Sequence, residues 1–175
     1  FIEAGVRMLA GGFFSAKPEF FDAIILNPPY RKLAAESKER SLLRQIGVDT
    51  SNLYTAFLSV ALKLLASEGE VVAITPRSFC NGPYFKPFRR LLIDTVRLRR
   101  LHVFESRNDV FGEEDVLQEN IVFHGVKGGA AQQVEISSST GPNDEQLSSR
   151  DVPYDQVIQP NDPDLFIHLV GDLVQ

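Results

Sequence analysis

The chain has 175 residues, of which 43% are hydrophobic and 23% charged, a composition typical of a globular domain and unlike that of disordered or fibrous chains. Its single cysteine, Cys80, excludes an internal disulfide and a zinc site built from several cysteines. The net charge of −5 excludes a surface that is basic throughout, so any contact with nucleic acid must be local. No apolar run approaches the ~20 residues that cross a bilayer, and the first residues do not resemble a signal peptide. We therefore expect a cytoplasmic protein with no membrane partner.

The first half of the chain alternates strand-like and helix-like segments. Residues 22–26 form an apolar run without polar alternation, which predicts a parallel strand buried on both faces. The charged stretch 31–50 predicts a helix or mobile loop over the surface. Apolar side chains at helical spacing predict a helix from 51 or 52 to about 69, and residues 70–74 predict a second buried strand.

A second helix is predicted over residues 85–95, with Arg89 and Arg90 outside its apolar face. Alternating strands and helices imply right-handed crossovers and a parallel sheet covered by helices. Two more strands, over 98–104 and 120–126, are expected to form a hairpin-like pair at the edge of that sheet. The predicted fold is therefore an α/β domain with a mostly parallel sheet and an antiparallel edge pair.

After the fourth predicted strand the composition shifts to Ser, Gly, Pro and Asp. One more strand is possible over 133–136, and a linker is predicted from 137 to about 164, before a helix begins at 165–170. We therefore divide the chain into a domain at 1–136 and a segment at 137–175 that leads out of it.

The tetrapeptide Asn27-Pro28-Pro29-Tyr30 follows the first predicted strand directly, at the end where open α/β sheets bind ligands. The prolines fix the backbone and hold Asn27 and Pro28 rigidly. The Asn27 side-chain oxygen and the Pro28 carbonyl can together accept both hydrogens of a planar amino group, which draws its lone pair toward a nucleophilic form. Tyr30 offers a ring on which a planar substrate can stack. The alternative is a proline-terminated strand with a turn asparagine and a core tyrosine.

This motif resembles that of S-adenosylmethionine-dependent amino-methyltransferases, and within them the gamma-class adenine-specific (N6) DNA methyltransferases of restriction–modification systems. Some RNA methyltransferases and protein-glutamine methyltransferases share the motif, so the resemblance to the DNA enzymes rests on the segments that follow it. These segments lie at residues 51–57, 69–79, 104–107, 110–112 and 119–123. The resemblance covers about residues 11–126, and an extension to residue 169 stays open.

The resemblance implies the carboxyl half of the catalytic domain of a Rossmann-like class I methyltransferase. The parent enzyme would transfer a methyl group from S-adenosylmethionine (SAM) to the exocyclic amino group of adenine in a specific DNA sequence. The adenine would first be flipped out of the duplex, because its amino group is inaccessible there. Asn27, Pro28, Pro29 and Tyr30 correspond to the catalytic residues, Tyr30 also contacts the substrate, and Phe111 matches the aromatic on the other face of the flipped adenine.

The cofactor SAM would be held mainly by a Gly-rich loop and an acid that this chain does not contain. Phe13 and Asn27 correspond to residues that contact the cofactor. The chain begins without Met, so we expect a fragment that is inactive alone, with residues 137–175 leading towards a missing target-recognition domain. The strand at 22–26 pairs in the family with a strand absent here, so we also expect an exposed sheet edge through which the chain self-associates.

Two other functions stay open: an RNA or protein-glutamine N-methyltransferase, and a non-catalytic nucleic-acid-binding module with a methyltransferase-like fold. The charged stretch at 31–50 and the loop that carries Phe111 favour the DNA enzyme. Tyr54 and Phe57 are expected in the core, whereas Arg77 fits either a substrate phosphate or a surface ion pair.

The three histidines and the single thiol are poor candidates for catalysis. His102, His124 and His168 lack the spacing of metal ligands, so structural roles are expected and no metal site is predicted. Cys80 has no partner motif that would make it a nucleophile.

Overall fold

The computed structural model describes residues 1–9, 20–104, 120–139 and 148–169. The predicted contacts Phe13 and Phe111 lie outside these described residues. The helices and strands in chain order are α1 (Ile2–Leu9), β1 (Phe21–Leu26), α2 (Lys38–Gln45), α3 (Leu53–Leu64), β2 (Leu65–Pro76), the 3-10 turns η1 (Arg77–Phe79) and η2 (Pro83–Phe85), α4 (Lys86–Thr95), β3 (Val96–Phe104), β4 (Asn120–Lys127), β5 (Gln133–Ser139), β6 (Ser148–Pro153) and α5 (Tyr154–Val157).

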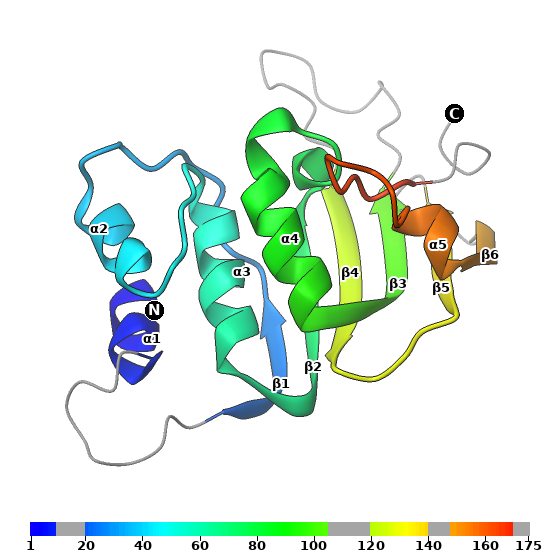
Figure 1. Cartoon of the computed structure of the whole chain (residues 1–175), viewed down its shortest axis with the longest axis horizontal. Helices are drawn as coiled ribbons and strands as arrows, with labels where there is room; N and C mark the ends of the chain where they lie inside the picture. Colours follow the sequence, from blue (N-terminus) through cyan, green and yellow to red (C-terminus); the bar gives the residue numbers. More distant parts are fainter. Residues whose placement is uncertain (10–19, 105–119, 140–147, 170–175) are drawn as a thin grey trace.

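The six strands of the described part form one sheet in the order β1-β2-β4-β3-β5-β6 (Figure 1). Strands β1, β2, β3 and β5 run in one direction, and β4 and β6 oppose them. The predicted α/β class, the mostly parallel sheet and the antiparallel pairing of β3 with β4 are confirmed. The edge lies two strands further out than expected, because β5 pairs with β3 and the antiparallel pair β5–β6 closes the sheet.

Residues predicted as a linker contribute to this sheet. Strand β6 pairs with β5 along its length, and the short helix α5 follows it. Val152 and Val157 are buried in the main core. Strand β6 could not be predicted from composition, because only one of its side chains is buried and it therefore has no apolar run.

The predicted helix at the end of the chain is absent from the described residues 165–169. Leu165 has a φ of 57°, in the left-handed region that interrupts a helix. The Asp162 carboxylate instead accepts the backbone N–H groups two and four residues further on, at 2.8 and 2.7 Å, a local pairing that competes with helical hydrogen bonds. The Ile167 N–H donates to the Cys80 carbonyl at 2.9 Å, which ties this segment to the residue that follows η1.

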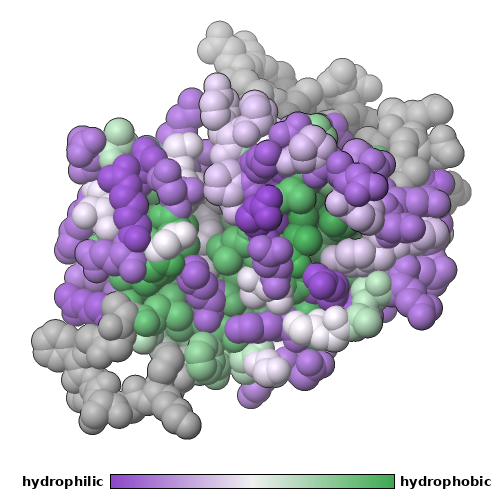
Figure 2. All heavy atoms as spheres, viewed as in Figure 1, coloured by the Kyte–Doolittle hydropathy of each residue, from purple (hydrophilic) through white to green (hydrophobic). Residues whose placement is uncertain are grey.

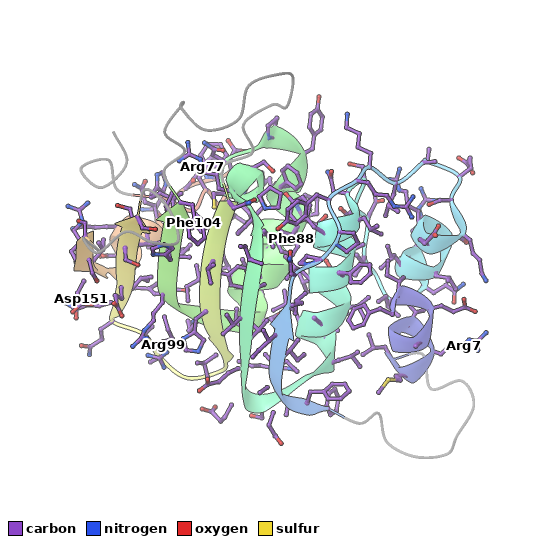
Figure 3. All side chains as sticks on the ribbon, turned by 180° about the vertical axis from the view of Figure 1, so that it is seen from behind. Arg7, Arg77, Phe88, Arg99, Phe104 and Asp151 are labelled. Carbon is purple, nitrogen blue, oxygen red and sulfur yellow. The ribbon has the colours of Figure 1, made fainter. Side chains whose placement is uncertain are left out.

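Helices α3 and α4 cover one face of the sheet, and α1 and α2 pack beside α3 (Figure 1). The main core lies between these two helices and alternate residues of β2, β3 and β4, and a second apolar cluster joins α1, α2 and α3. Figure 2 shows that hydrophobic side chains gather over the helices of this face, with hydrophilic ones around them. Seen from behind, the opposite face of the sheet carries no helix of the described residues (Figure 3).

The predicted helix over the charged stretch 31–50 is α2, whose first turn is capped by the Ser37 hydroxyl, which accepts the Arg40 N–H at 3.3 Å. Helix α3 ends at Leu64, about five residues before its predicted end. Residue 65 pairs with Phe21 of β1, so sheet pairing takes over from the helical pattern.

Strand β1 occupies the predicted segment and forms an edge of the sheet, as expected. The prediction that it is buried on both faces is wrong. Ile24 and Leu26 pack against the main core, whereas Ile25, on the other face, is 84% exposed. In the described structure, therefore, only one face of β1 packs against the core.

Candidate active site

The Asn-Pro-Pro-Tyr motif lies where β1 and β2 end side by side. The two strands are parallel, with Leu26 opposite Ala73, so the motif continues from β1 beside the last residues of β2. The Tyr30 hydroxyl lies 3.2 Å from Asn27 Oδ1 and 3.2 Å from the Ile74 carbonyl oxygen. Its single hydrogen can be donated to either acceptor, so Tyr30 joins the motif to β2.

The burial of the four motif residues differs in a way that suits a binding site. Pro28 is buried, whereas Asn27 and Pro29 are exposed and Tyr30 is 37% exposed. Partial burial raises the pKa of Tyr30, so its hydroxyl stays protonated and can donate at neutral pH. The motif therefore presents an amide and an aromatic ring to solvent on a fixed backbone.

The rings of Tyr30, Tyr54 and Phe85 form a row, in which Tyr54 contacts both of the others. The ring of Tyr54, on α3, meets Tyr30 edge-on at 6.2 Å between centroids and Phe85 of η2 at 5.8 Å. The Tyr54 hydroxyl lies 3.0 Å from Ser78 Oγ, and burial raises the pKa of Tyr54 well above its usual value. The expectation that Tyr54 belongs to the core is confirmed, and its place behind Tyr30 makes it a support of the site as well.

Phe57, also on α3, was expected in the same core. It is partly buried and packs against the second apolar cluster, where its ring stacks on Phe1 at 4.9 Å between centroids.

The turn that follows β2 is held by Arg89, whose side chain is fully buried. Its guanidinium donates to the carbonyls of Phe79 at 2.9 Å, Gly82 at 2.7 Å and Asp164 at 2.9 and 3.0 Å. Burial lowers the pKa of Arg89, and the nearby Asp164 opposes that shift. One side chain thus connects η1, η2 and the segment 162–169.

The prediction that Arg89 lies outside the apolar face of its helix is wrong. Position 89 is four residues after Phe85 and three before Leu92, so helical spacing alone places it on the inner face. The charge argued against that position, because arginine is rarely buried without partners. Three carbonyl groups at the turn supply those partners, and the sequence gives no sign of them.

Beside this turn lies a cleft of about 870 Å³. Arg77 and Asn81 line it from the segment after β2, together with Gln156 and Gln159 from the region of α5. Cys80 also lines it, and burial raises the pKa of this thiol to about 12. A neutral thiol is a poor nucleophile, in agreement with the prediction for Cys80.

The histidines lie in polar pairs. His102 has its ring nitrogens 2.9 Å from Ser137 Oγ and 3.0 Å from Ser139 Oγ, and burial lowers its pKa. His124 Nε2 lies 3.3 Å from a Glu70 carboxylate oxygen. Among the described residues, no group of three His, Cys, Asp or Glu side chains could hold a metal ion.

The fold is shared with class I SAM-dependent methyltransferases. The structure aligns with such a protein from Listeria monocytogenes at a TM-score of 0.56 and 9% identity, over 76% of this chain and 40% of that one. It aligns with the type IIG restriction endonuclease BpuSI at a TM-score of 0.57 and 18% identity, over 75% of this chain and 19% of that one. These likenesses establish the fold.

Residues 4–111 match the Eco57I restriction-modification methylase family, and the chain belongs to this family. The chain is 48% identical over 171 residues to the type II methyltransferase M.PstI of Providencia stuartii. This alignment covers 97% of this chain and 33% of that protein. The chain is 44% identical over 149 residues to the type II methyltransferase M.BsuBI of Bacillus subtilis, which covers 85% of this chain and 30% of that protein. The chain therefore spans about a third of the length of these relatives.

Proposed function

We propose that this chain is the part of a site-specific DNA methyltransferase that binds the amino group of the target base. The whole enzyme transfers a methyl group from SAM to the exocyclic amino group of adenine. The observation that carries the proposal is the position of Asn27 and Tyr30, exposed at the carboxyl end of β1 and joined by a hydroxyl–amide contact of 3.2 Å. The methylase family and the type II relatives favour DNA over RNA or protein glutamine as the substrate.

Asn27 acts as an acceptor whose direction is fixed in advance. An amide oxygen has two lone pairs, and the Tyr30 hydroxyl uses at most one of them. The second remains for one N–H of the adenine amino group, and the Pro28 carbonyl accepts the other. Because both hydrogens are then held, the nitrogen lone pair is freed from the ring and becomes nucleophilic without a strong base. Asn27 and the Pro28 carbonyl would thereby present this nitrogen as the nucleophile for the methyl group that bound SAM would supply.

The chain supplies only part of the cofactor and base pockets. Asn27, whose exposed amide lies at the strand end, is the described residue that fits a contact with SAM, and the cofactor supplies an electrophilic methyl group. Tyr30 stacks on the flipped adenine, with Phe111 on its other face. Since the rest of the SAM site lies elsewhere in the parent protein, we expect the isolated chain to be inactive.

We further propose that residues 137–175 lead towards a target-recognition domain, although their β6 and α5 pack on the catalytic domain. A buried, unreactive thiol at Cys80 and a DNA substrate are both consistent with work in the cytoplasm. No helix among the described residues is long and apolar enough to cross a membrane.

The open edge of β1 is proposed to pair with another copy of the isolated chain. Among the described residues, no strand pairs with the outer side of β1, and Ile25 exposes 84% of its surface on the sheet face away from the main core. Unpaired backbone groups beside an exposed apolar side chain are a template for further strands.

The deciding experiment measures transfer of labelled methyl from SAM to unmethylated DNA by the full-length enzyme, with the modified base identified by mass spectrometry. Asn27→Ala should lower the rate at least about a hundredfold, the loss typical when a preorganised polar contact to the reacting group is removed. Asn161→Ala, a change at an exposed asparagine in the turn after α5, is the matched control and should leave the rate unchanged. Methyladenine formed equally well by the Asn27 variant, or methyl transfer to RNA or protein only, would contradict the proposal.

A further inference from the structure

Tyr84 exposes 85% of its surface although it stands next to the candidate active site. It lies in η2, and the next residue, Phe85, packs against Tyr54 at 5.8 Å between ring centroids. Tyr54 in turn meets the ring of Tyr30 at 6.2 Å. The exposed ring is therefore attached to the same row of aromatic side chains that supports the motif, at the same end of the sheet.

The backbone that carries Tyr84 is held in place at Gly82, two residues before it. The Gly82 carbonyl accepts a hydrogen bond of 2.7 Å from Arg89, and the Gly82 N–H donates to the Ser78 carbonyl at 2.9 Å. A side chain at position 82 does not fit, because its Cβ would lie 2.5 Å from the Ser78 carbonyl oxygen. Pro83 precedes Tyr84 directly and fixes its own φ.

A large aromatic ring on a fixed turn is suited to contact a planar partner. A tyrosine loses only two side-chain torsions when it binds, and here the backbone has already been ordered, so little conformational entropy opposes the contact. Aromatic rings stack on nucleic-acid bases of any sequence, because every base has a π face. When adenine leaves the DNA duplex, the bases next to it lose a stacking partner.

We propose that Tyr84 contacts DNA and stacks on a base exposed next to the extruded adenine. This inference rests on the proposed function, since it takes DNA as the substrate. It assigns to η2 a role that is separate from the Asn-Pro-Pro-Tyr motif: Tyr84 stabilises the opened DNA, whereas Asn27 and Tyr30 hold the base that reacts. Arg89 is a positioning residue for this contact, because it fixes Gly82.

The test uses the 175-residue chain and a single-stranded oligonucleotide with a central 2-aminopurine, whose fluorescence falls when it stacks on an aromatic ring. Affinity is measured by anisotropy at low salt for the wild type, Tyr84→Phe, Tyr84→Ala and Phe20→Ala. The last is the matched control, an exposed aromatic that precedes β1 and contacts Lys127. Circular dichroism verifies that each variant is folded.

Tyr84→Ala should weaken binding at least about fivefold and abolish the quenching, in keeping with the usual contribution of a stacked base. Tyr84→Phe should retain both, because the ring is kept, and Phe20→Ala should bind like the wild type. Equal binding and quenching by Tyr84→Ala and the wild type would overturn the inference, and so would the absence of any binding by the wild-type chain.

Methyl transfer by the full-length enzyme separates this inference from the proposed function. Adenine methylation with an unchanged DNA KM in Tyr84→Ala would refute the role of Tyr84 alone. Ring-dependent binding without methylation of adenine would refute the proposed reaction and leave the DNA contact in place.

Discussion

Strand β1 is bounded differently at its carboxyl end and along its outer side. At the end, the Tyr30 hydroxyl finds acceptors on both the motif and β2. Along the outer side, no strand of the described residues pairs with β1, and Ile25 is exposed on the sheet face away from the core. Residues of this chain supply the hydrogen-bond acceptors at the carboxyl end of β1. None of the described strands pairs with its outer side.

The opposite edge of the sheet sharpens this contrast. Strand β6 has six residues, as β1 does, but places Ser148, Ser149 and Asp151 at the surface, with Val152 as its one buried residue. Polar edges of this kind resist pairing with other chains. The comparison indicates that β6 is suited to stand at an edge in water and that β1 is not.

The largest expected effect comes from removing the Arg89 guanidinium, which donates hydrogen bonds to three carbonyl groups near the turn after β2. Arg89→Met leaves the carbonyls of Phe79, Gly82 and Asp164 without their donor and should lower the free energy of unfolding by about 3 kcal/mol or more. Urea unfolding measures the loss. Arg90→Met, an exposed neighbour on the same helix, should change stability by less than ~0.5 kcal/mol, and similar losses in both variants would count against the network.

The outer side of β1 is tested by Ile25→Lys. If apolar contact at this edge drives self-association, the charge should weaken it roughly tenfold or more, as expected when an isoleucine is no longer buried between copies. Stability should change little, since the side chain is already exposed. Analytical ultracentrifugation over a range of concentrations measures the effect, and a wild-type chain that stays monomeric at every concentration would refute the proposed self-association.

A smaller loss of stability is expected when the contact between Tyr54 and Ser78 is removed. Tyr54→Phe keeps the aromatic row and removes the contact with Ser78 Oγ, so the chain should lose about 1 kcal/mol of stability. Ser78→Ala removes the same contact from its other side and should cost about as much, with little further loss in the double variant. Fully additive losses in urea unfolding would show that the two hydroxyl groups are not coupled.

The smallest effect concerns pH and the segment that Asp162 organises. Backbone N–H groups of residues 164 and 166 lower the pKa of this carboxyl in the folded chain. A lowered folded pKa means that the contribution is present above the unfolded value of about 4 and is lost as the pH falls through the folded pKa. Asp162→Asn should therefore reduce the loss of stability between about pH 4 and pH 2, measured by urea unfolding. An unchanged pH profile would contradict the assignment.

Most of the fold could be predicted from the sequence, because β1 to β4, α3 and α4 each carry a clear apolar pattern and the motif marks one strand end. Strand β6 was missed because its pairing uses the backbone and a single apolar side chain. Arg89 was misplaced because its partners are carbonyl groups that come together only in the folded chain. The roles of Asn27 and Tyr30 stay predictions, although the contact between them fits the role that the motif suggests.

Cys80 offers a built-in reporter of how the candidate site opens. The thiol is almost completely buried, and the carbonyl of the same residue accepts the Ile167 N–H. A thiol reagent can react only after this region has opened, so its rate of labelling measures the opening equilibrium. If labelling is much faster than global unfolding allows, the segment 162–169 detaches as a local unit, and the cleft beside Arg77 widens without loss of the sheet.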